Sequence, residues 1–286
     1  VFYHPEELML DSLSVLDGFT IRDGNASGKA EVWDTYYGGG MFNYNSSPTI
    51  KNCFFTNNSA NSGGGGMHNE YYSFVKISNC IFSGNIAYGI YHANDWINDG
   101  GGGIYCFYHS SIAASNCRFE NDSAYVTGWS WIFDSGGGGG ILCQFESEAL
   151  IENCYFGSNF AEYNGNGISV DGGSLTVFNS IFEGSGSDIT SGKTSLSNCL
   201  FFGESGISAE TSKIGNCTFY NKTKTALLTT NGELINSVFW GNNSIISSTG
   251  TIFASNSCIQ GGESRFSGNN NIFTNPLFKD VDNDDF

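Results

Sequence analysis

The sequence predicts an all-β protein, and more specifically a right-handed parallel β-helix (β-solenoid) of about ten coils, each of two to three short strands. Three observations predict it: a phrase centred on Asn that recurs along the chain, a second phrase rich in glycine, and a composition with 39 Gly, only 3 Pro and 14% charged residues. Because a repeat in sequence usually indicates a repeat in space, the periodicity is the first guide to the fold.

The first phrase appears as SPTIKNCFFTNNSA at 47–60 and again as FVKISNCIFSGNIA at 74–87. Its central residue, the marker, is always Gly or Asn; the ten markers are Gly18, Asn52, Asn79, Asn116, Asn153, Asn179, Asn198, Asn216, Asn236 and Asn256. The residues two before and three after the marker are apolar in every copy, and the next residue is Phe19 in the first copy and Cys or Ser afterwards. Since Asn and Gly enter the left-handed region cheaply, a bend at the marker lets the residues on both sides point inward.

The spacing of the markers predicts how the chain winds. The last four spacings are 19, 18, 20 and 20 residues, which is too short for a βαβ crossover of roughly 30 residues. A coil that returns each copy onto the one before pairs parallel strands about 4.8 Å apart. Parallel crossovers are overwhelmingly right-handed, so we expect a right-handed winding.

The second phrase precedes five of the markers and reads GGGMFN, GGGMHN, GGGIYC, GGGILC and GNGISV. Glycine runs such as 63–66 and 136–140 also occur in phosphate-cradling loops, but those loops need a following helix and usually a Lys. We therefore expect tight glycine turns that stack on one another and lead into another strand.

These phrases resemble the repeats of bacterial surface and secreted β-helix proteins of the polymorphic-outer-membrane-protein type, whose marks are Gly-Gly-Ala/Ile and Phe-x-x-Asn. The chain shows GGGI, and FTNN, FSGN, FEND and FGSN at Phe55, Phe82, Phe119 and Phe156. The resemblance covers almost the whole chain and implies a pectin-lyase-like fold on a bacterial surface or in its secretions. It implies little about activity, since the matching residues are structural.

We expect residues 1–286 to form a single β-helix domain that is part of a longer polypeptide, because the chain starts without Met and ends on DNDDF. The net charge of −17 disfavours nucleic acid as a partner and favours an extracellular or bacterial cell-surface location. The sequence contains no run of 18 apolar residues, so it predicts no membrane-spanning segment.

The nine cysteines predict a ladder rather than a disulfide framework. Cys53, Cys80, Cys117 and Cys154 follow successive markers, and Cys199 and Cys217 continue the series. Parallel neighbours about 4.8 Å apart are further apart than the Cβ atoms of a disulfide, so buried free thiols are favoured over bridges or a metal site.

Three insertions enlarge the early coils, at 22–37, 88–100 and 125–137. Because insertions at equivalent points project from one side, we expect a common aromatic and acidic surface that binds carbohydrate. Its candidate ligand-binding residues are Trp33, Asp34, Tyr36, Tyr91, Asp95, Trp96, Trp129, Trp131 and Asp134. The alternative is that these aromatic residues only pack the long loops together.

A polysaccharide lyase or glycoside hydrolase of the pectin-lyase-like fold is the rival to an adhesive or structural module. Lyase chemistry needs a cationic group beside the sugar, for which the Arg118–Glu120 pair is thin evidence. Acidic loops also offer paired carboxylates. The His residues show no metal spacing, so the sequence assigns no catalytic residue and leaves enzyme activity open.

The acidic end of the chain alternates as in a calcium loop, through Asp280, Asp282 and Asp284, but it lacks the Gly and the distal Glu of an EF-hand. Ca²⁺ is thus a weak candidate there, and no other cofactor is expected.

Positions two and four after the marker should point outward, yet many of them are large and apolar. We expect these side chains to line one side of the rod as an interface with another protein, or with a second copy in a homo-oligomer or filament. The candidate interface residues are Phe54, Ile81, Tyr155, Ile181, Leu200, Phe202, Tyr220, Val238 and Trp240.

Overall fold

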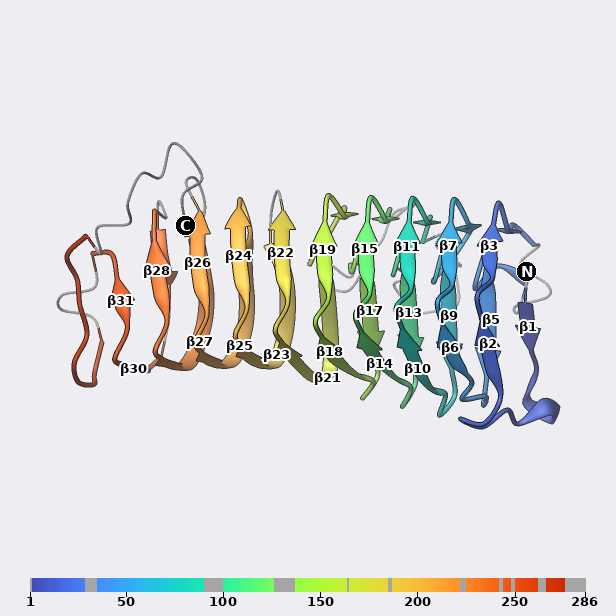
Figure 1. Ribbon diagram of the computed structural model, residues 1–286, viewed down its shortest axis with the longest axis horizontal. Coiled ribbons are helices and arrows are strands. Elements are labelled where there is room, and N and C mark those ends of the chain that lie inside the picture. Colours follow the sequence, from blue (N-terminus) through green and yellow to red (C-terminus); the bar gives the residue numbers. More distant parts are fainter. Residues whose placement is uncertain are drawn as a thin grey trace.

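The computed structural model describes residues 2–28, 35–89, 100–125, 137–163, 165–184, 187–221, 225–241, 244–247, 250–261 and 266–275. The strands stack one behind another along a rod that runs from the N-terminal end to the C-terminal end (Figure 1). Every pairing between the strands is parallel, and strands that pair come from successive repeats. The predicted parallel β-helix is therefore confirmed.

Three curled sheets form the walls of the rod, and the one helical element among the described residues is a 3₁₀ turn at Glu6–Leu8. Sheet A has 16 strands: β1 (Phe2–His4), β2 (Val15–Asp17), β5 (Met41–Tyr44), β6 (Thr49–Lys51), β9 (Met67–Glu70), β10 (Phe74–Ser78), β13 (Ile104–Phe107), β14 (Ser111–Ser115), β17 (Ile141–Gln144), β18 (Glu148–Glu152), β21 (Ile168–Phe178), β23 (Ser187–Ser197), β25 (Gly206–Gly215), β27 (Thr225–Ile235), β29 (Ser244–Ser247) and β30 (Ile252–Ser255). Sheet B has ten strands, one for each predicted coil: β3 (Thr20–Arg22), β7 (Phe54–Thr56), β11 (Ile81–Ser83), β15 (Arg118–Glu120), β19 (Tyr155–Gly157), β22 (Ile181–Gly184), β24 (Leu200–Gly203), β26 (Thr218–Asn221), β28 (Val238–Trp240) and β31 (Cys258–Ile259). Sheet C has five: β4 (Asn25–Ala26), β8 (Ser59–Ala60), β12 (Ile86–Ala87), β16 (Ser123–Ala124) and β20 (Phe160–Ala161).

The corner between sheets A and B is the marker residue. All ten markers have positive φ, from 49° at Asn236 to 76° at Gly18, as the sequence predicts. Asn also contributes a hydrogen bond along the corner, because the Asn198 side-chain amide donates to Asn179 Oδ1 at 3.1 Å. The corner continues past the predicted copies: Asn270 has φ 59° and donates to Asn256 Oδ1 at 3.2 Å.

The centre of the rod is a stack of phenylalanine rings, one from each strand of sheet B between β7 and β28. Neighbouring centroids lie 4.4–5.1 Å apart and neighbouring planes are inclined by 3–11°. The rings are at most 2% exposed and belong to Phe55, Phe82, Phe119, Phe156, Phe182, Phe201, Phe219 and Phe239. The parallel register forces this stacking, since each Phe pairs with the equivalent Phe of the next coil.

The position after the marker holds the predicted thiol ladder, and all nine cysteines are buried free thiols. Ser180, Ser237 and Ser257 fill the same slot in other coils and are 1% exposed. The first copy differs, because Phe19 remains 51% exposed. It lies in the first coil of sheet B, where β3 pairs with β7 on one side only, and so no further coil covers its ring.

The glycine runs form stacked turns, as predicted, and no helix follows them. Gly64 has φ +71°, and a Cβ there would lie 2.3 Å from the Met67 carbonyl oxygen. Backbone amides donate from turn to turn, as from Gly64 to the Gly100 carbonyl at 3.0 Å. A Cβ on Gly63 would meet the Tyr105 ring at 1.9 Å, so glycine also leaves room for a side chain of the next coil.

Sheet A changes character along the rod. In the early coils it is broken by a corner whose two residues both have positive φ, although they are bulky: Tyr71–Tyr72, Tyr108–His109 and Phe145–Glu146. Backbone hydrogen bonds between coils hold this costly conformation, such as His109 N to Phe145 O at 2.9 Å. From β21 onward one strand of 10 or 11 residues runs through the same region in β21, β23, β25 and β27.

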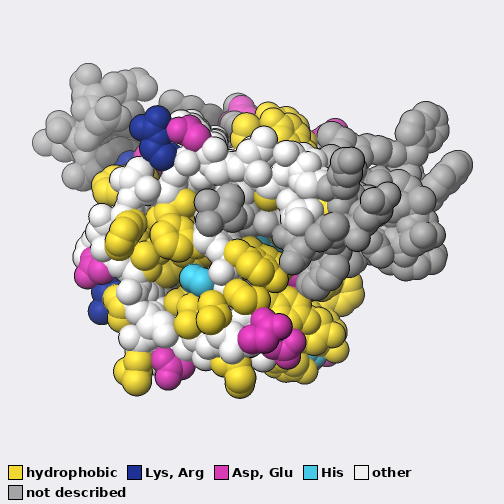
Figure 2. All heavy atoms as spheres, turned by 90° about the vertical axis from the view of Figure 1, so that its right-hand side faces the viewer, with side chains coloured by type: hydrophobic (Ala, Val, Ile, Leu, Met, Phe, Trp, Pro, Cys, Tyr) yellow, Lys and Arg dark blue, Asp and Glu magenta, His cyan; other side chains and the backbone are white. Residues whose placement is uncertain are grey.

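Groups of apolar side chains lie on the N-terminal end of the rod, among polar and charged ones (Figure 2). Phe2 packs edge-on against Phe19 with centroids 6.4 Å apart, and Leu8, Met9 and Leu13 are all more than half exposed nearby in the chain. This end therefore presents hydrophobic surface together with the unpaired edges of its strands.

Candidate functional site

The outer face of sheet A carries rows of polar side chains in register. One row contains Ser174, Lys193, Thr211 and Asn231, and the next contains Thr176, Ser195, Lys213 and Glu233. Residues between the rows point inward, as the burial of Leu175 shows. Strands β21 to β27 thus position the outward residues at the coil spacing.

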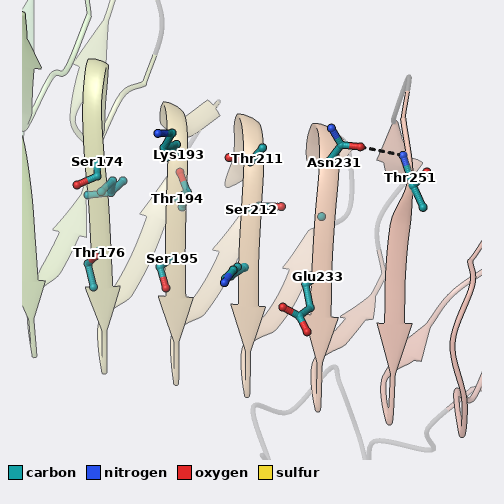
Figure 3. A pocket seen from close by; sticks show the side chains of 13 residues that line it. Ser174, Thr176, Lys193, Thr194, Ser195, Thr211, Ser212, Asn231, Glu233 and Thr251 are labelled. Atoms are coloured by element: carbon teal, nitrogen blue, oxygen red, sulfur yellow. Dashed lines mark hydrogen bonds between the residues drawn. The ribbon is translucent and has the colours of Figure 1, made fainter. Parts of the chain in front are cut away.

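These rows line an open groove of about 440 Å³, which crosses sheet A along the rod (Figure 3). Most of its lining residues are polar in type, although carbon atoms form most of the surface that they expose to the groove: Ser174, Thr176, Lys193, Thr194, Ser195, Thr211, Ser212, Lys213, Asn231, Glu233 and Thr251, with Leu175 and Gly232. Asn231 Oδ1 accepts a hydrogen bond from the Thr251 amide at 3.1 Å and so is held in place.

A second groove of about 320 Å³ extends the first toward the N-terminal end. It shares Ser174 and Thr176 with the first groove and reaches Lys76 on β10. Together the two grooves span the strands from β10 to the Thr251 segment, about 34 Å at about 4.8 Å per coil. We call this continuous surface the sheet A groove.

The charge of the sheet A groove differs from that of the chain. Lys76, Lys193 and Lys213 line it and are exposed, against two acidic residues, Glu148 and Glu233. Over the part of the chain that the structure describes, no carboxylate lies within ion-pair distance of these three ammonium groups. A chain with a net charge of −17 therefore has unpaired cations at this surface.

The two carboxylates of the groove are not placed as the catalytic pair of a glycosidase. Glu148 on β18 accepts a hydrogen bond from Ser174 Oγ at 2.8 Å, and Glu233 lies on β27, four coils further along. Their separation of about 19 Å along the rod is far beyond the roughly 5–9.5 Å between the two carboxyl groups of a glycosidase. The described lining contains no His or Arg to act in their place.

A second polar cluster lies on the outer face of β9, β13 and β17. His68 Nε2 and Glu70 Oε2 are 3.1 Å apart, and Tyr105 donates from its hydroxyl to Gln144 Oε1 at 2.7 Å. His68 and Tyr105 are 0% exposed although they point away from the core that holds Met67 and Ile104. The ring of Tyr37 helps to cover His68, and the two ring centroids are 4.5 Å apart. Tyr37 belongs to the described end of the first insertion.

The His68–Glu70 pair has the arrangement of a histidine oriented by a carboxylate. If Nε2 carries the proton and donates to Glu70, Nδ1 is left as a basic atom, and it has no hydrogen-bond partner among the described residues. Such a nitrogen can act as a general base. Complete burial leaves it no contact with solvent in this structure, so the sheet A groove is the more accessible site.

Most of the aromatic and acidic residues predicted in the insertions lie outside the described residues: Trp33, Asp34, Tyr91, Asp95, Trp96, Trp129, Trp131 and Asp134. Tyr36 is described and is 5% exposed, which leaves little of its ring for a ligand. The insertions do leave from equivalent points, because Tyr88 and Tyr125 follow paired strands of sheet C and their rings stack at 6.2 Å.

The predicted interface residues all lie on the outer face of sheet B, where the register places them in neighbouring rows. Phe54, Ile181 and Leu200 are exposed by 47%, 40% and 37%. The others are half-buried: Ile81, Tyr155, Phe202, Tyr220, Val238 and Trp240.

Some of these half-buried side chains are covered by neighbouring residues on the same outer face of sheet B. The Arg118 guanidinium, paired with Glu120 as expected, lies 4.4 Å from the Tyr155 ring centroid. Burial next to the Glu183 carboxylate raises the pKa of Tyr155 to about 12. Its hydroxyl donates to that carboxylate at 2.6 Å, so a hydrogen bond within the chain links the neighbouring strands β19 and β22 on this face.

The predicted calcium ligands Asp280, Asp282 and Asp284 lie outside the described residues. Within the described ranges no group of three His, Cys, Asp or Glu side chains is arranged to hold a metal ion. Likewise, none of the helical structure described is long and apolar enough to cross a membrane.

Sequence reasoning missed both polar sites. The signal for the sheet A groove was the run of three polar residues before the apolar one that precedes each marker, as in KTSLSN and TSKIGN. The His68 cluster was signalled by consecutive large residues after the glycines, as in GGGIYC, which indicate a strand covered on both faces. Searches against protein-family models, curated proteins and solved structures found no match to the chain.

Proposed function

We propose that this protein is an extracellular or cell-surface β-helix module that binds a linear, hydroxyl-rich polymer, a polysaccharide, in the sheet A groove. The single observation that carries the proposal is the continuity of the two grooves, which share Ser174 and Thr176. An extended chain laid along the rod meets rows of polar side chains from β21 to β27, and in the second groove it also meets the apolar side chains of Phe74, Ala113 and Leu150.

The chemistry of the lining supports a sugar ligand. Hydroxyl and amide side chains at fixed spacing can donate to and accept from sugar hydroxyls. Unpaired Lys76, Lys193 and Lys213 add donors that no described carboxylate occupies. The paired strands fix the spacing of these residues before binding, but the exposed Lys side chains have to be ordered by the ligand.

The test is retention of the protein on a panel of linear polysaccharides, with a groove variant and a matched control. Thr211→Trp fills the groove from an exposed position on β25, and Thr20→Trp places the same ring on exposed β3 of sheet B. We expect Thr211→Trp to weaken binding at least tenfold, with Thr20→Trp unchanged and both melting temperatures within a few degrees of the wild type. Equal binding by the two variants would place the ligand elsewhere.

The aromatic insertions are proposed as a second contact for the same polymer, since aromatic rings beside carboxylates suit sugar faces and hydroxyls. Trp96→Ala and Trp131→Ala should then reduce binding while the melting temperature stays within a few degrees. Loss of stability without loss of a ligand would favour the alternative, in which these residues only pack the loops.

An activity as a polysaccharide lyase or glycoside hydrolase is the second candidate, and the observation that favours it is the oriented His68–Glu70 pair. A screen for new reducing ends and for unsaturated uronates tests it. If His68 takes part in such an activity, the activity should disappear in His68→Gln while the variant stays folded. An activity that survives this substitution would remove His68 from the chemistry.

Self-association through the outer face of sheet B is also proposed, on the exposure of Phe54, Ile181 and Leu200 along one side of the rod. Light scattering at micromolar concentration should show a larger species for the wild type than for Ile181→Lys with Leu200→Lys. A wild type that is strictly monomeric would end this proposal.

A further inference from the structure

A buried polar ladder runs through the early coils, one residue per coil, six positions after each marker. Its members are Asn58, Asn85, Asp122 and Asn159, which are 0%, 0%, 0% and 6% exposed. Three of the four are amides and one is an acid. The acid ends the phrase FEND, where the other copies end in Asn.

Each Asn of the ladder has the same task. Its side-chain amide donates to the backbone carbonyl of the coil before: Asn58 Nδ2 to Ile21 O at 3.0 Å, Asn85 Nδ2 to Phe55 O at 2.9 Å and Asn159 Nδ2 to Phe119 O at 2.8 Å. A hydroxyl takes over in a later coil, where Ser205 Oγ donates to Phe182 O at 3.2 Å. The carbonyl three residues after the marker therefore receives a side-chain donor from the next coil.

Asp122 reproduces only half of this pattern. Its Oδ1 accepts from the Asn85 backbone amide at 2.8 Å and from Asn85 Nδ2 at 2.9 Å, as the Asn oxygens do in their coils. Its Oδ2 corresponds to the donating nitrogen of an Asn, is fully buried and has no hydrogen-bond partner among the described residues. The equivalent carbonyl of the coil before is that of Phe82. An ionised carboxylate offers this carbonyl no donor, whereas a protonated one does.

We propose that Asp122 is held as a neutral acid in the folded protein and that its hydroxyl replaces the missing amide as donor to the Phe82 carbonyl. Asp122 then carries a structural proton in the ladder of the early coils. Loss of this proton as the pH rises leaves two hydrogen-bond acceptors, Asp122 Oδ2 and the Phe82 carbonyl oxygen, facing each other in the core. This destabilises the turn of the β-helix that contains Asp122.

The surroundings of Asp122 favour the neutral form. Burial raises the pKa of its carboxyl well above the usual range, against the opposing effect of the hydrogen bonds from Asn85. The one charged group that acts on it among the described residues is Glu120, on β15, which raises the pKa further and is itself paired with Arg118 on the outside. Asn85 and Asn159, its neighbours in the ladder, are uncharged.

The sign of the pH dependence follows from this direction. The folded protein keeps a proton that the unfolded chain releases above about pH 4, the ordinary pKa of Asp. Stability from this group is fully present below that pH, and it is lost as pH rises toward the pKa of the folded state. One proton changes the unfolding equilibrium constant up to tenfold per pH unit in this range.

The experiment compares the wild type with Asp122→Asn, which restores the donor without a charge. Urea unfolding at a series of pH values from 4 to 9 should give similar midpoints near pH 4. The ratio of the two unfolding constants should then grow up to tenfold per pH unit, with Asp122→Asn the more stable variant. All other ionisable groups are common to both proteins, so their effects cancel in this ratio.

Two further measurements keep the proposal open to refutation. Asn58→Asp places an acid at the equivalent position two coils away and should introduce the same loss of stability with rising pH. Infrared spectra of the wild type at pH 7 should contain a protonated-carboxyl band that Asp122→Asn lacks. A ratio of unfolding constants that does not vary with pH, or a wild type without that band, would overturn the proposal.

Discussion

The coils with markers Asn52 to Asn153 use more residues to form one turn of the β-helix than the coils with markers Asn179 to Asn256. The early, wide coils use all three sheets, glycine turns and a corner of bulky residues with positive φ. The later, narrow coils omit sheet C, and one long strand crosses sheet A in most of them.

Both kinds of coil keep the Asn corner and the small side chain after it, and all of them but the coil of Asn256, which has Ile259, keep the Phe ring. A coil therefore requires the corner, the small residue and a buried large apolar side chain, and the remaining features of the wide coils are additions that carry the insertions.

The largest effect is expected at the feature that the two regions share. Phe201→Ala removes a ring from between Phe182 and Phe219 in the narrow coils and should lower the free energy of unfolding by about 3–5 kcal/mol. Phe119→Ala should cost a similar amount in the wide coils. Phe202→Ala, on the outer face, is the control and should cost clearly less in urea unfolding. A large difference between Phe119→Ala and Phe201→Ala would contradict a common framework.

The glycine turns should be essential in the wide coils alone. Gly101 has φ +70°, and a Cβ would lie 2.3 Å from the Ile104 carbonyl oxygen, so Gly101→Ala should cost on the order of 2 kcal/mol or more. Gly192 in the narrow coils has no heavy atom nearer than 3.9 Å to such a Cβ. Gly192→Ala should therefore be close to neutral in melting temperature. If both substitutions are tolerated, the turns are not constrained as described.

The corner should distinguish conformation from hydrogen bonding. Asn198→Val forces a β-branched residue into the left-handed region and should cost on the order of 1–2 kcal/mol. Asn198→Gly keeps the conformation and loses only the exposed bond to Asn179, so it should cost about 1 kcal/mol or less. Thermal melting of the two variants is sufficient, and equal losses would argue against the bend.

The smallest effect is expected in the slot after the corner. Cys217 Sγ donates to Gly215 O at 3.2 Å, and Ser237 Oγ makes the equivalent bond to Ile235 O at 2.9 Å. Since both residue types already fill this slot, Cys217→Ser should change the free energy of unfolding by less than about 1 kcal/mol.

The thiols of this slot should react only after unfolding. Contact with the Cys154 thiol, together with burial, raises the pKa of Cys117 to about 12, and burial raises that of Cys53. The same contact lowers the pKa of Cys154, so burial of all nine thiols is the common reason why thiol titration of the native protein near pH 8 should be slow, whereas the denatured chain should release nine thiols without reductant. Disulfides found by mass spectrometry would contradict the ladder.

The fold could be predicted from sequence because its rules are local and repeated. A left-handed corner selects Asn or Gly at every copy, and the inward slots select apolar or small residues, so ten copies show the same pattern. Phe19 departs from it for a reason that no pattern contains, which is that it lies in an end coil. The pairing of Arg118 with Glu120 was predictable because the two are neighbours on one face of a strand.

The sites were harder to predict because they depend on what faces outward in several coils at once. Lys193 and Lys213 are 20 residues apart in the chain and become neighbours only when β23 and β25 pair in register. The burial of His68 depends on Tyr37 and Tyr105, which are distant in sequence and lie beside it only in the folded chain. The carboxyl of Asp122 is unusual only by comparison with its Asn neighbours in space.

The narrow coils also determine how the length of this protein can change over generations. Each of them presents the same corner and the same ring to the coil before and the coil after, as β24 does to β22 and β26. A deletion or duplication of the 18–20 residues between two equivalent corners recreates a junction that already exists. The rod can thus be shortened or extended in steps of about 4.8 Å by unequal copying of the gene, with no new contact surface to be invented.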